Sequence, residues 1–152
     1  MRVEEKQNLS VYYYIKETLS GYPTVTVTDD YPNTELTLPS VAVVGNEIYP
    51  KPQELGNRRG VRNRLWDIEI FCNMKTQRDA ITSLLLDTIE DEYIPVYDYD
   101  QGFPPSGVPM LGILKVKPNS LIASPITIFP ELVEKLYWRG RIKFLTEYES
   151  IT

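Results

Sequence analysis

Apolar residues recur at helical spacing in two stretches of the chain. A helix is predicted over residues 2–19, and the glycine and proline at positions 21 and 23 mark its end. A second helix ending near Tyr93 is predicted, because Thr76-Gln77-Arg78-Asp79 has the form of a helix N-cap that places Asp79 in the first turn. The stripe of the first helix consists of Leu9, Tyr12, Tyr13 and Lys16, and that of the second of Ala80, Ile81, Leu84, Leu85 and Ile89.

The remaining apolar runs have the length and spacing of strands. They cover residues 24–28, 41–44, 64–72, 94–99, 111–116, 121–129 and 136–148. The run 41–44 is apolar throughout, which predicts a strand covered on both faces. Runs 64–72 and 136–148 alternate, which predicts one apolar face and a more polar face turned outward. The order of elements predicts an α+β fold: a largely antiparallel sheet of about five to six strands with two helices packed on it.

A chain of 152 residues is expected to form a single domain. Segments 45–64 and 101–110 are rich in glycine and proline, and we expect them to be extended loops of that domain. Glu4 and Glu5 near the N-terminus are not followed by an apolar run, so no signal peptide is expected. No run approaches the roughly 20 apolar residues of a membrane span, and no contact with a membrane is expected.

Composition argues against an enzyme. The chain has no histidine and one cysteine, Cys72, so Ser-His and Cys-His pairs and the usual zinc sites are excluded. No phosphate-binding or nucleophile motif occurs, and we expect neither a catalytic residue nor a metal or cofactor. The sequence Asp98-x-Asp100-x-Gly102 lacks the glycine and glutamate positions of a calcium-binding EF-hand loop, so a turn with solvated aspartates is expected.

Charge is unevenly distributed along the chain. Sixteen basic and 21 acidic residues give a net charge of −5, which opposes strong binding of nucleic acid. The segment 51–64 nevertheless carries a net charge of +4, and segment 87–100 contains six acidic and no basic residues. The basic candidates for a contact are Arg58, Arg59, Arg62 and Arg64, and the acidic candidates are Asp91, Glu92, Asp98 and Asp100. We expect the arginines to meet an acidic protein partner first and a DNA backbone second, with solvated surfaces as the alternative.

Tyrosine is unusually frequent, with 11 tyrosines against 4 phenylalanines. Three successive tyrosines, Tyr12-Tyr13-Tyr14, cannot all face one core, because successive helical residues point about 100° apart. We therefore expect at least one of them to be exposed or to meet a neighbouring molecule. Tyr12, Tyr14 and the loop residue Phe103 are the apolar candidates for an interface.

The layout resembles that of the tail terminator (tail completion) proteins of long-tailed bacteriophages. The resemblance spans residues 9–144 and rests on the order of several segments. They are the N-terminal helix, Pro39-Ser40-Val41-Ala42-Val43, Glu54-Leu55-Gly56 with the arginines after it, Arg64-Leu65-Trp66-Asp67-Ile68-Glu69-Ile70-Phe71, the Arg78-Asp79 helix, and Ile94-Pro95-Val96-Tyr97-Asp98-Tyr99. The chain departs from the smallest members in its longer segments 101–109 and 118–130.

The resemblance implies a structural virion protein at the top of the tail, made in the host cytoplasm. Such subunits form a hexameric ring that caps the tail tube, stops its polymerisation and offers a surface to the head-tail connector. The implied partners are further copies of the chain, the tail tube protein and a connector or neck protein. Genomic DNA is expected to pass through the ring without specific binding.

Other functions fit the same sequence. A neck or head-completion protein of the virion has similar size and composition. From a different class, a DNA-binding accessory protein would use the Arg58–Arg64 loop, and an enzyme would require a carboxylate site that no motif reveals. The sequence leaves open the number of subunits in a ring, which loops face which partner, and the type of tail.

Overall fold

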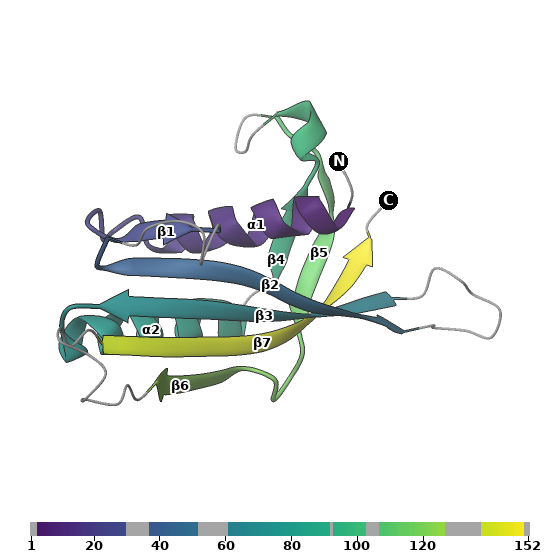
Figure 1. Cartoon of the computed structure of the whole chain (residues 1–152). Coiled ribbons are helices and arrows are strands. Elements are labelled where there is room, and N and C mark those ends of the chain that lie inside the picture. Colours follow the sequence, from purple (N-terminus) through teal and green to yellow (C-terminus); the bar gives the residue numbers. More distant parts are fainter. Residues whose placement is uncertain are drawn as a thin grey trace.

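The computed structural model describes residues 3–29, 37–51, 61–91, 93–102, 107–126 and 138–150. Figure 1 shows the elements in chain order. They are α1 (Val3–Thr18), β1 (Thr26–Thr28), β2 (Ser40–Lys51), β3 (Val61–Cys72), α2 (Lys75–Asp91), β4 (Ile94–Tyr97), the 3-10 helix η1 (Tyr99–Gln101), β5 (Met110–Val116), β6 (Ile122–Ile126) and β7 (Trp138–Ser150).

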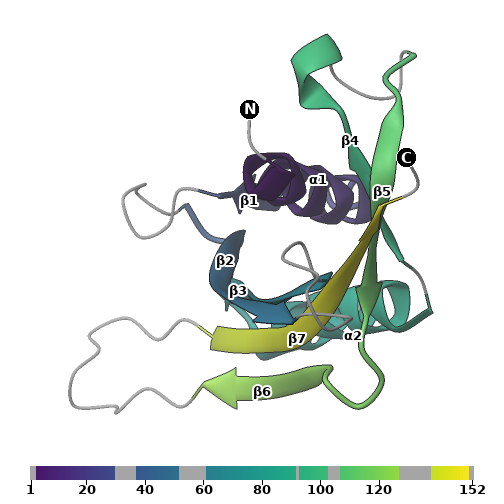
Figure 2. The ribbon, with the colours of Figure 1, turned by 90° about the vertical axis from the view of Figure 1, so that its right-hand side faces the viewer.

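The strands form one seven-stranded sheet in the order β1-β2-β3-β7-β5-β4, and β6 pairs with β7 beside β5. β5 pairs with residues 146–150 of β7, while β6 pairs with residues 139–143. All pairs are antiparallel except β1 with β2. The sheet curls into a half-barrel, as the view in Figure 2 shows. The predicted α+β class is confirmed, with one strand more than the largest number expected.

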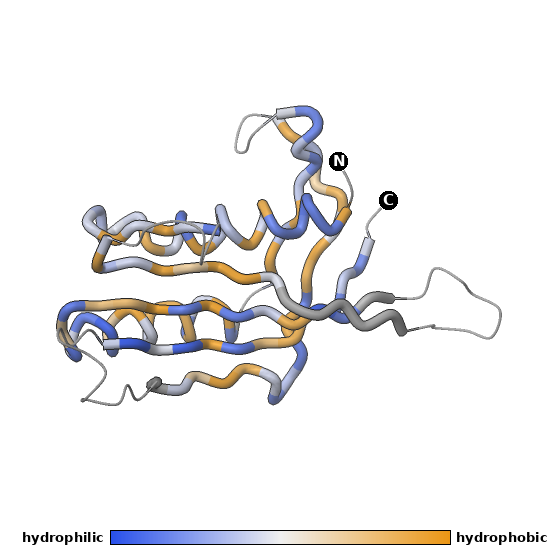
Figure 3. Tube along the Cα trace, viewed as in Figure 1, coloured by the Kyte–Doolittle hydropathy of each residue, from blue (hydrophilic) through white to orange (hydrophobic). Residues whose placement is uncertain are grey.

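Both helices contribute to the core on the inner face of the half-barrel. The central inner positions of β3 and β7 are fully buried, and Figure 3 shows hydrophobic residues along these strands. The Trp66 indole N–H donates a hydrogen bond to the Thr146 hydroxyl at 2.9 Å, which satisfies the polar atom of a fully buried ring. The fully buried core residues of the strands and helices are Val11, Ile15, Val41, Trp66, Ile68, Ile70, Cys72, Ile81, Leu85, Ile89, Ile94, Val96, Leu114, Ile142 and Phe144.

The helices lie where they were predicted, but their buried faces and starts differ in detail. α1 buries Val11 and Ile15 rather than the predicted stripe, because its contacts lie with β1, β2, β4 and α2 around it. α2 begins at Lys75, so Thr76 lies inside the helix and does not cap it, and Ala80 is exposed. The predicted loop 45–64 is shorter, because β2 continues to Lys51 and β3 begins at Val61.

The outer face of β3, turned away from the helices, is also covered. Glu69 is 5 % exposed and lies opposite Arg141 of β7 in the strand register. Its carboxylate pairs with Arg141 at 2.5 Å and with Arg139 at 3.6 Å. The alternation predicted a more polar face turned outward. The outer face does carry charged residues, as predicted. Its central carboxylate, that of Glu69, is buried by ion pairs with the neighbouring strand and does not face solvent.

Candidate functional site

Helix α1 closes the open side of the half-barrel by sealing the edges of two strands. On one side, the Tyr97 N–H of β4 donates a hydrogen bond to the Ser10 hydroxyl at 3.3 Å. Pro95 lies two residues earlier on the same edge of β4 and has no N–H to leave unpaired. On the other side, the Tyr12 hydroxyl donates to the Val27 carbonyl of β1 at 3.3 Å. α1 therefore occupies part of each edge that an added strand would need.

The three successive tyrosines of α1 contact three different elements. Tyr12 bonds β1 as described, and Tyr13 stacks on Tyr99 of η1 with ring centroids 5.9 Å apart. The Tyr14 hydroxyl donates to the Thr88 carbonyl of α2 at 3.2 Å. Each tyrosine thus has a partner within the chain. The sequence predicted that at least one of them would be exposed or would meet a neighbouring molecule, and all three are partly exposed.

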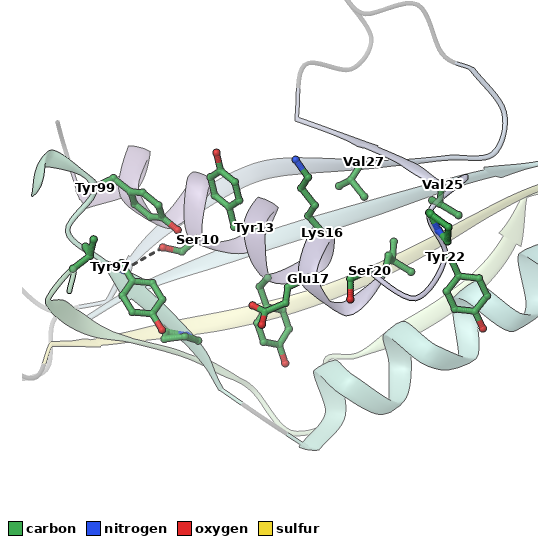
Figure 4. A pocket seen from close by; sticks show the side chains of 15 residues that line it. Ser10, Tyr13, Lys16, Glu17, Ser20, Tyr22, Val25, Val27, Tyr97 and Tyr99 are labelled. Carbon is green, nitrogen blue, oxygen red and sulfur yellow. Dashed lines mark hydrogen bonds between the residues drawn. The ribbon is translucent and has the colours of Figure 1, made fainter. Parts of the chain in front are cut away.

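A groove of about 710 Å³ runs along the outer side of α1. Figure 4 shows Tyr97 and Tyr99 at one end, Tyr22 at the other, and Glu17 between them. Its size is within the range of natural ligand and peptide sites, and its walls are mainly aromatic and aliphatic. We call it the tyrosine groove. Its lining consists of Ser10, Tyr13, Tyr14, Lys16, Glu17, Leu19, Ser20, Tyr22, Pro23, Val25, Val27, Pro95, Tyr97, Tyr99 and Val108.

The aromatic rings of the groove are held in place by one another. Tyr99 is 6 % exposed, and its ring meets Tyr97 edge-on with centroids 6.5 Å apart. Burial raises the pKa of the Tyr99 hydroxyl. The Lys16 ammonium lies 5.8 Å from the Tyr12 ring centroid and 5.9 Å from that of Tyr13. Rigid rings with polar tips along a groove are typical of a surface that binds another molecule by side-chain packing.

A second hollow of about 610 Å³ adjoins the tyrosine groove on the side of α2. It shares Tyr14, Glu17 and Pro95 with the groove. Tyr93, which is 55 % exposed, also lines it. Apolar surface therefore extends from the groove around α1 toward α2.

Asp98 and Asp100 lie at the end of the groove and are paired within the chain. The Lys6 ammonium of α1 contacts Asp98 at 2.8 Å and Asp100 at 3.0 Å. The hydrogen bonds to Lys6 lower the pKa of both carboxyls, and the carboxylates in turn raise the pKa of Lys6. Asp98 also accepts a hydrogen bond from the Asp100 N–H at the start of η1. The solvated turn expected from the sequence is thus a turn anchored to α1, which weakens the case for Asp98 as a contact with another molecule.

Arg64 is buried, so its expected role as a surface contact is wrong. The side chain is inserted beneath α1, where one amino group donates to the Glu4 carbonyl at 3.0 Å and to the Gln7 side chain at 3.4 Å. A second amino group bonds the Asn8 side chain. The guanidinium also lies 4.2 Å from the Trp66 ring centroid. Arg64 therefore tethers the first turns of α1 to the sheet.

The other predicted contact residues cannot be assigned a surface. Arg62 lies in β3 and Asp91 is the last residue of α2, and for these two the structure describes the backbone alone. Arg58, Arg59, Glu92 and Phe103 lie outside the described residues.

Several residues that build this site were not singled out from the sequence. Lys6 and Ser10 are polar residues on the buried side of α1, spaced i and i+4 so that they share a face. That spacing was the available signal, but their partners lie some 90 residues away in β4 and η1. Tyr22 and Tyr93 carried no pattern that separated them from other tyrosines.

A different surface lies on the opposite side of the molecule. Ile122 and Ser124 of β6 are exposed and lie opposite Lys143 and Arg141 of β7. We call these four residues the β6 edge. Ile122 is 57 % exposed, and Trp138 at the start of β7 is 40 % exposed. Figures 1 and 2 place α1 at the top and β6 at the bottom in two perpendicular views, so the groove and the β6 edge lie on opposite sides.

The lone cysteine and the carboxylates of the described residues were the remaining candidates for reactive or metal-binding groups. The Cys72 thiol is buried, and burial raises its pKa to about 11, which leaves it protonated and a poor nucleophile at neutral pH. Among the described residues, no group of three or more Cys, Asp or Glu is placed to hold a metal ion. In the same part of the chain, neither helix is long and apolar enough to cross a membrane.

The chain matches no protein family model, and no curated protein is significantly similar to it in sequence.

Proposed function

We propose that the protein is a ring-forming tail terminator of a long-tailed bacteriophage, a structural virion protein without catalytic activity. In this role it caps the tail tube, stops its polymerisation and provides the surface to which the head is joined. The observation that carries the proposal is the pair of dissimilar surfaces on opposite sides of the subunit, the tyrosine groove and the β6 edge. The resemblance of the element order to that family supports it.

Two dissimilar surfaces are what a ring requires. In a head-to-tail contact, each copy uses one surface toward one neighbour and a different surface toward the next, and the contacts close when the rotation closes. A symmetric dimer would instead need one self-complementary surface. Exposed aromatic and apolar side chains on both surfaces agree with this kind of association.

The DNA-binding alternative loses support. Arg64 is occupied by α1 and is not available to a phosphate group. The net charge of −5 also opposes a polyanion. A neck or head-completion ring, in contrast, would use the same kind of surfaces, so the experiment must separate it from a terminator.

The test is the phenotype of phage particles made without this protein. A tail tube without its terminator continues to grow, so we expect overlong, headless tails in electron micrographs. Tails of normal length without heads would contradict the terminator and identify a neck protein instead. A complementing copy of the wild-type gene is the control and should restore normal, head-joined tails.

A further inference from the structure

We propose that copies of the chain associate head to tail, with the β6 edge of one copy packed on the tyrosine groove of the next. This inference rests on the ring-forming function proposed above and names the two surfaces that make its contact. The occupant of the groove is thus a second copy of this chain.

The two surfaces differ in the strand edges that they contain. α1 occupies part of the edges of β1 and β4 through Tyr12 and Ser10, and in the described part of the chain the groove between them is lined by side chains. β6 pairs with β7 and with no other strand in the described part of the chain. Pro125 removes one N–H from β6, and proline in an edge strand lies where a ladder is not continued. The contact is therefore made by side-chain packing and not by strand addition.

Exposed apolar surface is found on both sides of the proposed contact. Ile122 projects from the β6 edge and is 57 % exposed, a high value for an isoleucine. The groove presents the exposed ring of Tyr22 and the partly exposed ring of Tyr97 along a concave surface. A protruding aliphatic side chain in a tyrosine-lined hollow has the form of a central interface contact.

Charge is complementary between the two surfaces. The described segments on the groove side, 3–29 and 97–102, contain six acidic and two basic residues, a net charge of −4. Within the groove itself, Lys16 and Glu17 are the charged lining residues. β6 and the paired part of β7, residues 122–126 and 138–143, contain three basic residues and no acidic residue. Two of them, Arg139 and Arg141, share the carboxylate of Glu69 in β3, so the group carries a net charge of +2. Opposite charge on two surfaces of one subunit favours contact between unlike surfaces and disfavours groove-to-groove pairing.

The test uses one variant for each surface. Ser20→Arg places a long cationic side chain at an exposed position of the groove, and Ile122→Asp replaces the exposed isoleucine of the β6 edge with an acid. Both positions are exposed, so the fold should be retained, which circular dichroism and thermal unfolding will check. Ser20→Ala and Ile122→Val are the matched controls and should associate as the wild type does.

Light scattering and native mass spectrometry of the purified full-length proteins provide the readout, at concentrations up to millimolar. Each variant alone should self-associate about tenfold or more weakly than the wild type, a loss typical of one central contact. When the two variants are mixed, one keeps an intact β6 edge and the other an intact groove. The mixture should therefore form a one-to-one heterodimer that neither variant forms alone.

Several results would overturn the inference. They are a wild-type protein that remains monomeric, a variant that associates as the wild type does, or a mixture that remains monomeric. If the variants still form wild-type rings, the assignment of surfaces fails while the ring-forming function stands. If the mixture forms heterodimers but phage without the protein have tails of normal length, the assignment stands and the terminator function fails.

Discussion

The two faces of β3 are both buried from Trp66 to Cys72, but they are covered by different chemistry. On the inner face, Trp66, Ile68 and Phe144 are fully buried against the helices. On the outer face, Glu69 is 5 % exposed and is covered by Arg139 and Arg141 of the next strand. The inner face is stabilised by the area it removes from water, whereas the outer face depends on ion pairs between neighbouring strands.

The guanidinium group of Arg139 also covers an aromatic ring on the outer face. The Arg139 guanidinium lies 4.8 Å from the Phe71 ring centroid, and Phe71 is 2 % exposed. Long cationic side chains can thus shield both a carboxylate and an aromatic ring on a face without a packed layer of helices. Alternation of apolar and charged residues therefore indicates two faces of different chemistry, but not which of them is exposed.

The largest expected effect is on the inner face. Trp66→Ala removes the largest fully buried side chain and leaves a cavity, so we expect the free energy of unfolding to fall by about 3–5 kcal/mol. Trp66→Phe is the matched control. It keeps most of the apolar volume, so the free energy of unfolding should fall less. In both variants the Thr146 hydroxyl can still donate to the Arg64 carbonyl. Urea denaturation of the three proteins measures the order, and equal losses for both variants would contradict the cavity argument.

A smaller effect is expected on the outer face. Glu69→Ala leaves Arg139 and Arg141 without their shared carboxylate, but both arginines reach solvent, with side chains 20 % and 38 % exposed. Because they can be rehydrated, we expect a loss of about 2 kcal/mol, less than for a pair buried on both sides. Glu69→Gln keeps a hydrogen-bond acceptor and should lose less in the same denaturation experiment. A loss for Glu69→Ala as large as that for Trp66→Ala would mean that the two faces are equally dependent on their cover.

The smallest effect concerns an ion-pair cluster outside both faces, that of Lys6 with Asp98 and Asp100. Because Lys6 lowers the pKa of both carboxyls, the stabilisation from the aspartates is present above their ordinary pKa of about 3.9 and is lost as pH falls through the lower folded values. Because the pKa of Lys6 is raised, its share is present below about 10.4 and is lost as pH rises through the higher folded value. The melting temperature of the wild type should therefore be higher than that of Lys6→Met at neutral pH. The difference should disappear at strongly acidic and at strongly alkaline pH.

Thermal unfolding of the two proteins across pH measures this difference. Lys16→Met is the control, because Lys16 is exposed and lies over tyrosine rings. A difference for Lys6→Met that persists unchanged at acid pH would show that the methylene groups of Lys6, and not its charge, stabilise the contact of α1 with η1.

The order of helices and strands could be predicted from the sequence because it depends on neighbouring residues. The turn residues after α1 and the alternation along β3 are local signals, and both elements lie close to the predicted ranges. The fully apolar run 41–44 likewise predicted burial on both faces, and Val41 and Ala42 are indeed fully buried. The α+β class follows from these local features.

The roles of particular polar side chains were decided by the tertiary structure. The sequence places Arg64 in a basic segment that was predicted to lie at the surface. It is buried because α1 packs over it and supplies a carbonyl and two side-chain amides as acceptors. Tyr12, Tyr13 and Tyr14 were predicted to be more than one core could hold. In the structure each contacts a different element around α1. Periodicity shows which residues share a face, because it is a property of one helix or strand. Which partner that face meets depends on contacts between residues far apart in the chain, and those are fixed only when the sheet curls and α1 closes it.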